Sequence, residues 1–399
     1  MSGCCSASNN FYDVPPEPSG CGCASSDGNQ PGPGSALNLF QEAADKLTGP
    51  LEVMWTVSRE CNFACPHCFN NSGPKKQLTH IPVEEIVAHI LEVQPYNVCL
   101  CGGEPFAWDC LDRILVDLSR GGIPLISCVT NGYLVTPERL KEVIDNGLTN
   151  LQFSIDGHCA EVHQGTRSAR QGFDRVMAAL SAALELQEAE RLNTVAVSFT
   201  PTRHNFHHYE ATARKLIGLG VRMIRCQPFM PCGRGIKAAA ALVPSAGDYA
   251  SLMLDIRNLR AEYGRQGVTL EWGCPLEHLW MFSQTPVRPQ SVFINSYGWY
   301  ELSPYLPLFL GDTRVHSIKS FWQLGQEEAW KLPLVVKMAR TLLTLDGMSK
   351  IQPVPYYDPP VLIDLFDDEN RALAEQTDDE KVLIEYARNK RLYRSLEVA

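Results

Sequence analysis

Short apolar runs alternate with helix-like segments between residues 50 and 235. In the helix-like segments apolar residues recur every three or four positions, whereas the runs between them are mostly apolar, as in buried strands. The strand-like segments, each with its exit loop, are 51–58, 97–105, 123–132, 150–157, 194–202 and 221–229. The helix-like segments between them are 82–95, 111–122, 136–147, 172–190 and 209–220. This alternation predicts a parallel sheet with right-handed crossovers, and six strands predict a partial (β/α)6 TIM-like barrel whose functional edge lies at the carboxyl ends of the strands.

The chain outside residues 50–240 has a different texture. Residues 1–36 are rich in Gly, Pro, Ser and Asn and bury too little apolar surface to fold alone, so we expect a disordered tail. Residues 245–365 hold strand-like runs around a turn at Gly298, followed by helix-like stretches, and predict a smaller α+β C-terminal domain. Residues 366–399 are highly charged and predict a surface helix.

Charge and composition narrow the class of protein. The formal net charge of −10 argues against a nucleic-acid partner. The chain has no run of 18 apolar residues, and its first residues lack a basic stretch followed by an apolar one, so we expect neither a membrane span nor a signal peptide. A cytoplasmic protein is expected, and its fifteen cysteines then point to metal binding, redox chemistry or buried thiols rather than disulfides.

Three cysteines are gathered just after the first strand, in the stretch CNFACPHCF. Cys61, Cys65 and Cys68 have the spacing C-x3-C-x2-C. A structural zinc site would need a distant fourth ligand such as His67 or Cys101, and buried inert thiols would need an apolar setting that this polar loop does not offer. An iron–sulfur cluster with one iron lacking a protein ligand fits better, and such an open site binds a small molecule.

The cysteine stretch resembles the CxxxCxxC signature of the radical S-adenosylmethionine (radical SAM) superfamily. Three further stretches resemble the family's motifs, in the family's order and at successive strand ends: CGGEP at 101–105, TNG at 130–132 and SIDG at 154–157. The resemblance covers residues 50 to about 235. It implies one 4Fe–4S cluster held by the three cysteines, with the amino and carboxylate groups of S-adenosylmethionine on the remaining iron.

Roles for residues near the first two motifs follow from the same resemblance. The backbone at His67 is expected beside the adenine, although a loop histidine is an equal alternative. Gly102 and Gly103 have no Cβ and let the backbone approach a ligand closely. Glu104 is expected to accept hydrogen bonds from the ammonium group of the cofactor, and Pro105 stiffens the exit of the strand.

The later motifs supply the remaining candidate cofactor contacts. Thr130 and Ser154 suit the ribose or the carboxylate by resemblance. Asp156 either bonds the ribose or stabilises the turn that follows it. Arg167 is expected to pair with the carboxylate, because a guanidinium group forms charge-assisted bonds to such a group, and Arg170 is the rival for this role.

The stretch from 292 to 322 resembles the core of a SPASM domain, a module that carries auxiliary iron–sulfur clusters in peptide-modifying relatives. Where that family has a proline followed by a cysteine, this chain has Pro304 and Tyr305. Cys274 stands upstream and no cysteine follows it. Since a cluster needs about four thiolates, we expect a degenerate module that keeps the fold without the metal.

Other cysteines leave alternatives open. The stretch RCQPFMPCGRG resembles the sixth-strand exit of peptide-modifying members, where Cys226 and Cys232 are either structural or return a hydrogen atom to a substrate radical; Cys232 is the candidate catalytic residue. The tail cysteines are expected to have no catalytic role, although they could bind a metal. They are Cys4, Cys5, Cys21 and Cys23.

The leading interpretation is a radical SAM enzyme that modifies a ribosomally made peptide or small protein. Its electron is expected from an external donor of the flavodoxin or ferredoxin type. The alternatives are an enzyme of tetrapyrrole or other cofactor biosynthesis and a non-catalytic iron–sulfur scaffold or electron carrier. Neither a nucleic acid nor a membrane is an expected partner.

Overall fold

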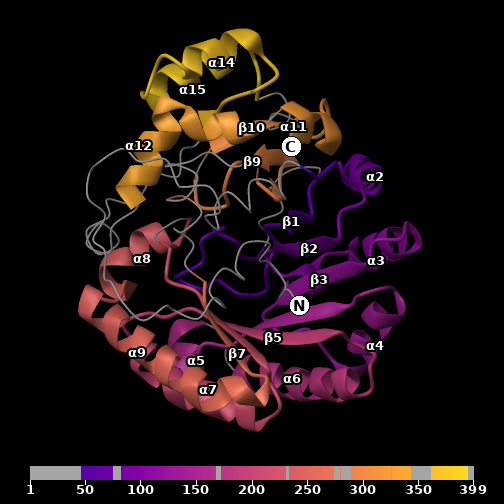
Figure 1. Cartoon of the computed structure of the whole chain (residues 1–399), viewed down its shortest axis with the longest axis vertical. Coiled ribbons are helices and arrows are strands. Elements are labelled where there is room, and N and C mark those ends of the chain that lie inside the picture. The colour runs from indigo at the N-terminus through magenta and orange to yellow at the C-terminus, as the bar shows by residue number, and fades with distance from the viewer. Residues whose placement is uncertain are drawn as a thin grey trace.

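The structure of the chain is a computed structural model, shown in Figure 1. It describes the following residues: 46–74, 82–167, 172–230, 233–273, 279, 289–306, 308–324, 326–342 and 361–393. The predicted tail at 1–36, with its four cysteines, lies outside them, as do Arg170, Cys232 and Cys274.

One sheet forms the frame of the molecule, in the order β11-β10-β9-β8-β1-β2-β3-β4-β5-β6-β7. The strands predicted for the barrel are all present: β1 (Glu52–Ser58), β2 (Asn97–Gly102), β3 (Leu125–Thr130), β4 (Asn150–Ser154), β5 (Thr194–Phe199) and β6 (Met223–Cys226). They pair in parallel and in chain order. The outermost strands of the sheet do not pair with each other, so the barrel is partial and the predicted fold class is confirmed.

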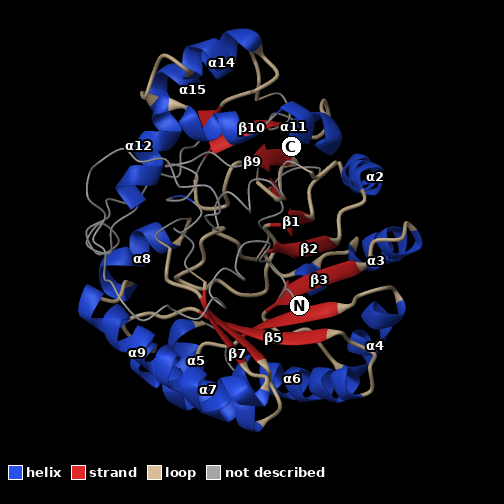
Figure 2. Ribbon diagram, in the orientation of Figure 1, coloured by secondary structure: helices blue, strands red, loops and turns tan. Residues whose placement is uncertain are grey.

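Helices follow the strands and cover the outer side of the sheet (Figure 2). Those in predicted segments are α2 (Val83–Val93), α3 (Leu111–Arg120), α4 (Pro137–Asp145), α6 (Gly172–Glu188) and α7 (Tyr209–Gly218). Further helices are α5 (Ala160–Thr166), α8 (Gly235–Leu242) and α9 (Ala246–Tyr263). The start of α4 follows from its sequence, because the Thr136 hydroxyl accepts a hydrogen bond from the Arg139 amide at 3.2 Å and Pro137 suits the first helical position.

The C-terminal region continues the barrel sheet. β7 (Thr269–Trp272) adds a parallel strand beside β6, and β8 (Ser291–Ile294) pairs in parallel with β1. From β8 the sheet runs on through β9 (Trp299–Glu301) and β10 (Leu308–Asp312), which are antiparallel, to β11 (Val361–Leu362). The packing helices are α11 (Ile318–Leu324) and α12 (Pro333–Leu342). The region after residue 245 therefore contains both helices and strands, as an α+β region does, but its strands extend the barrel sheet.

The charged C-terminal segment differs from its prediction. Where the sequence predicts one surface helix, the structure has α14 (Asp368–Ala374) and α15 (Glu380–Asn389). Each begins at an aspartate whose side chain accepts a hydrogen bond from the first turn, Asp367 from the Asn370 amide and Asp379 from the Lys381 amide. The cap at Asp379 therefore starts a second helix within the segment.

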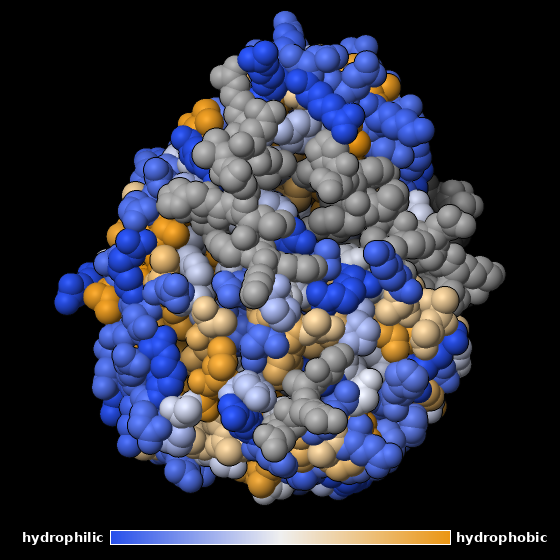
Figure 3. All heavy atoms as spheres, turned by 180° about the vertical axis from the view of Figure 1, so that it is seen from behind, coloured by the Kyte–Doolittle hydropathy of each residue, from blue (hydrophilic) through white to orange (hydrophobic). Residues whose placement is uncertain are grey.

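The face in Figure 3 is mostly hydrophilic, with smaller apolar patches between the charged residues. Among the described residues, every helix is too short or too polar to cross a membrane.

Candidate active site at the carboxyl ends of the strands

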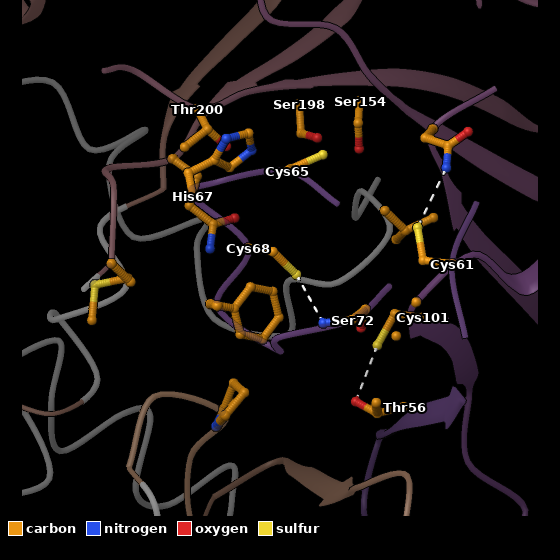
Figure 4. Close-up of a pocket in the computed structure, with 18 of the residues that line it drawn as sticks. Thr56, Cys61, Cys65, His67, Cys68, Ser72, Cys101, Ser154, Ser198 and Thr200 are labelled. Carbon is orange, nitrogen blue, oxygen red and sulfur yellow. Dashed lines mark hydrogen bonds between the residues drawn. The ribbon is translucent and has the colours of Figure 1, made fainter. Parts of the chain in front are cut away.

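The cysteine loop, residues 61–74, leaves the carboxyl end of β1 and borders a cavity of about 230 Å³. Cys61, Cys65 and Cys68 all line it, and Figure 4 shows their side chains around the same open space. Short local bonds shape the loop: the Cys61 sulfur accepts from the Phe63 amide at 3.3 Å, and the Cys68 sulfur from the Ser72 amide at 3.4 Å. The structure thus brings the three predicted ligands to one site.

The three thiols suit a cluster. Among the described residues, no three His, Cys, Asp or Glu side chains are close enough together to hold a single metal ion. In a cluster each thiolate binds a different iron atom, so the sulfurs need not converge on one point. Burial raises the pKa of Cys61 to about 12 and that of Cys65 to about 11, so loading the site with metal must displace protons from these thiols.

Six of the predicted cofactor contacts also line the cavity. They are His67, Gly102, Gly103, Thr130, Ser154 and Arg167. They come from the cysteine loop, from the exits of β2, β3 and β4, and from the end of α5. Glu104 and Asp156 lie behind this lining, where they are almost fully buried.

Glu104 connects the exits of β2 and β3. One carboxylate oxygen accepts from the Thr130 hydroxyl at 2.7 Å and from the Phe106 amide at 3.1 Å, and the other accepts from the Asn131 amide at 2.7 Å. Burial raises the pKa of Glu104 to about 7, although these hydrogen bonds oppose the shift. The hydrogen bonds described for Glu104 all come from groups of the protein. Its contact with the ammonium group of the cofactor stays a prediction.

Gly102 and Gly103 let the exit of β2 pass close to the exit of β1. A Cβ on Gly102, whose φ is +128°, would lie 2.6 Å from the Ser58 carbonyl oxygen, and one on Gly103 would lie 1.9 Å from that of Glu60. The Gly103 amide donates to the Ser58 carbonyl at 2.7 Å. Among the described atoms, these glycines come close to the backbone that leads into the cysteine loop, and a close approach to a ligand stays a prediction.

Asp156 orients Arg167. The Asp156 carboxylate accepts from the Arg167 Nε at 2.6 Å and from the Thr200 amide at 2.8 Å. Burial acts to raise the pKa of Asp156, but Arg167 and then His67 outweigh it and the pKa is lowered. The His67 Nε2 lies 3.7 Å from the same carboxylate, and burial, followed by the charge of Arg167, lowers the pKa of His67 to about 4. At neutral pH Asp156 and Arg167 therefore form an ion pair, and the imidazole of His67 beside them is neutral.

Arg234 is a site residue that the sequence analysis missed. Its Nη1 donates to the Cys65 carbonyl at 2.8 Å, its Nη2 donates to the Ser72 carbonyl, and its amide donates to the Cys68 carbonyl at 2.9 Å. The preceding Gly233 has a φ of +54° and packs so closely that a Cβ would lie 2.1 Å from the Phe69 carbonyl oxygen. The residues that lead into α8 therefore fix the backbone of the cysteine loop.

Replacing Arg234 by glutamine is expected to lower iron retention about tenfold, because removing a group that positions metal ligands typically costs 10–100-fold in metal affinity. A lysine should not restore it, since one ammonium group does not reproduce the fork that reaches two carbonyls. Iron per chain after gel filtration, together with the electron paramagnetic resonance signal, measures the effect. The matched control is Arg203→Gln, which removes a bond from an arginine Nε to the Val243 carbonyl outside the site. Equal iron in the two glutamine variants would contradict this role.

Tyr305 closes a side of the cavity. It stands where the resembled family has a cysteine, and its hydroxyl accepts a hydrogen bond from the Gln227 side chain at the exit of β6. Its ring lies 5.8 Å from that of Phe69 in the cysteine loop. Cys226, at the end of β6, is fully buried, and burial raises the pKa of its thiol well above the usual value, as for a thiol packed in the core.

Comparison with known proteins defines the class. Residues 55–216 match the family model of the Radical SAM superfamily. These residues contain most of β1, all of β2 to β5 and the four motifs described above, so this segment of the chain carries a radical SAM domain.

Several characterised proteins are similar to part of the chain. Mycofactocin maturase MftC from Mycobacterium ulcerans is 27% identical over 222 residues, which cover 54% of this chain and 57% of that protein. PqqA peptide cyclase from Bradyrhizobium diazoefficiens is 27% identical over 216 residues, 52% of this chain and 54% of that protein. AdoMet-dependent heme synthase from Methanosarcina barkeri is 22% identical over 300 residues, 69% of this chain and 82% of that protein. The chain thus aligns with little more than half the length of the first two.

Solved structures share the fold. Streptococcus suis SuiB bound to S-adenosylmethionine aligns with a TM-score of 0.54 and 14% identity, over 70% of this chain and 67% of that one. anSMEcpe with bound AdoMet and Kp18Cys peptide aligns with a TM-score of 0.53 and 16% identity, over 70% of this chain and 82% of that one. At this identity the likeness concerns the fold alone.

Proposed function

We propose that this chain is a radical SAM enzyme that modifies a ribosomally made peptide. The observation that carries the proposal is the cysteine loop at the exit of β1, which opens onto a cavity lined by the other family motifs. The substrate class rests on the similarity to PqqA peptide cyclase and to MftC. The SPASM-like framework without auxiliary thiols supports it as an analogy.

The donor set fits the implied cofactors. Three thiols from one loop border the cavity, and small hydroxyl groups and an arginine lie on the neighbouring strand exits, where the hydroxyls and carboxylate of a nucleoside amino acid would find partners. A 4Fe–4S cluster held by Cys61, Cys65 and Cys68, reduced by an external electron donor, would supply the electron for reductive cleavage of bound S-adenosylmethionine, and the resulting radical would be able to remove a hydrogen atom from a substrate.

The residues of the chain position and shield this chemistry. Asp156 fixes the Nε side of Arg167, so that the rest of the guanidinium group is available to the cofactor carboxylate. Arg234 sets the shape of the cysteine loop. The contact between Tyr305 and Gln227 closes the wall beyond the sixth strand and limits access of water to the cavity.

The test is anaerobic reconstitution with iron and sulfide, followed by incubation with dithionite and S-adenosylmethionine. We expect about one cluster per chain and time-dependent release of 5′-deoxyadenosine, measured by liquid chromatography. Addition of candidate precursor peptides should then give one peptide with a changed mass. A loaded cluster without 5′-deoxyadenosine release would favour the scaffold or electron carrier instead.

A second candidate is tetrapyrrole chemistry, favoured by the alignment with AdoMet-dependent heme synthase over most of that protein. Conversion of an iron–tetrapyrrole substrate by the reconstituted protein, with no change in any peptide, would decide for this candidate.

A further inference from the structure

The wall of the cavity farthest along the sheet from Arg167 comes from the C-terminal strands. Pairing places Met54 of β1 beside Phe293 of β8, and Phe293 beside Glu301 of β9. Residues paired in this way point to the same side of a sheet, and all three line the cavity. Thr56 and Cys101, also paired with each other, line it two residues further along their strands.

Glu301 is the carboxyl group of this wall. Its neighbours in the cavity lining are apolar or uncharged: Met54, Thr56, Cys101, Phe293, Pro304 and Tyr305. Among the described residues, Glu301 forms no ion pair with a lysine, arginine or histidine. Burial raises the pKa of Glu301 to about 8, against a smaller lowering effect of the Asn295 side chain. Burial is also the main reason that the pKa of the Cys101 thiol is raised, with a smaller contribution from the charge of Glu301.

The charges of the cavity are therefore divided between two sides. The arginines that line it, Arg167 and Arg225, follow β4 and lie on β6, on the side suited to anionic groups. Glu301 lies beyond β1 and β8 on the other side. With its raised pKa, Glu301 is mostly protonated at neutral pH while no cation stands beside it. A cation that entered this side of the cavity would favour the carboxylate form and displace the proton.

We propose that Glu301 forms a cation-binding subsite of the cavity and binds a protonated amine or guanidinium group of the substrate. This inference rests on the proposed function. This subsite would narrow the substrate class to peptides that place a lysine, an arginine or a free amino terminus in the cavity. Thr56, Cys101 and Phe293 then surround the carbon chain that carries the cation.

The experiment compares two small probes on the reconstituted holoenzyme with S-adenosylmethionine present. N-acetyl-lysine methylamide carries the cation, and N-acetyl-norleucine methylamide has a neutral chain of similar length. Dissociation constants come from ligand-observed nuclear magnetic resonance. We expect the wild-type protein to bind the lysine probe about tenfold more tightly, as expected for one charge-assisted bond of about 1.4 kcal/mol.

Glu301→Gln should bind the two probes equally, whereas Glu301→Asp should keep part of the preference. The norleucine probe serves as the internal check, because a misfolded variant binds neither probe and the folded glutamine variant still binds the neutral one. Glu188→Gln, at an exposed position on α6, is the matched control and should keep the full preference.

Two failures can be told apart. If the wild-type protein releases no 5′-deoxyadenosine, the proposed function fails, whatever the probes do. If it releases 5′-deoxyadenosine but the lysine preference is absent, or survives in Glu301→Gln, the cation subsite is wrong and the proposed function stands.

Discussion

Cys65→Ala should leave a folded protein that retains less than about one hundredth of the wild-type cluster, a loss beyond the 10–100-fold typical of supporting residues. Cys65 is the middle thiol of the loop, lines the cavity and is almost fully buried, so no solvent ligand replaces it easily. Iron and sulfide analysis, the visible absorption of the cluster and 5′-deoxyadenosine release measure the effect.

The matched control for this change is Cys110→Ala. Cys110 is a partly exposed free thiol just before α3 and outside the cavity lining, so iron content and cofactor cleavage should stay at the wild-type level. A normal cluster in Cys65→Ala, or equal losses in both variants, would show that the three-cysteine loop is not the cluster site.

Gly103→Ala is expected to destabilise the protein by about 3 kcal/mol or more, measured as the free energy of unfolding in urea. The added Cβ would lie 1.9 Å from the Glu60 carbonyl oxygen, so backbone rather than a flexible side chain must move. Because Glu60 directly precedes Cys61, the same movement should lower iron retention.

Gly165→Ala provides the comparison for Gly103→Ala. A Cβ at Gly165, within α5, has no atom within 4 Å, and alanine favours the helix by roughly 1 kcal/mol. It should be neutral or slightly stabilising and should keep its iron. Similar unfolding curves for the two variants would mean that the exits of β1 and β2 tolerate separation, contrary to the packing described above.

Local patterns sufficed to predict much of the barrel. Each of its first six strands is an apolar run of several residues, and helices such as α2 have a regular apolar face, on which Val83, Ile86 and Ile90 are buried. β7 has four residues and no such pattern, and its place beside β6 depends on packing far from it in the chain. The two helices after residue 366 had a readable signal, the capping aspartate Asp379, which the sequence analysis did not use.

Site residues that belong to a short sequence motif could be predicted, whereas those placed by contacts between distant parts of the chain could not. The cysteine spacing located Cys61, Cys65 and Cys68. Arg234 acts through backbone carbonyls that lie 169 and 162 residues away in sequence, and hydrogen bonds of this kind leave no local pattern. Glu301 likewise reaches the cavity only because β8 pairs with β1, a register that no short stretch of sequence specifies.

The position of β1 has a consequence for shortened forms of the protein. β1 is paired on both sides, with β2 and with β8. A form ending before residue 289 would leave those amides and carbonyls of Glu52–Trp55 that face β8 without partners, and such an open flank recruits strands from other molecules. β8 therefore covers the flank of the strand that leads into the cysteine loop, and forms of the protein that end before residue 289 should aggregate.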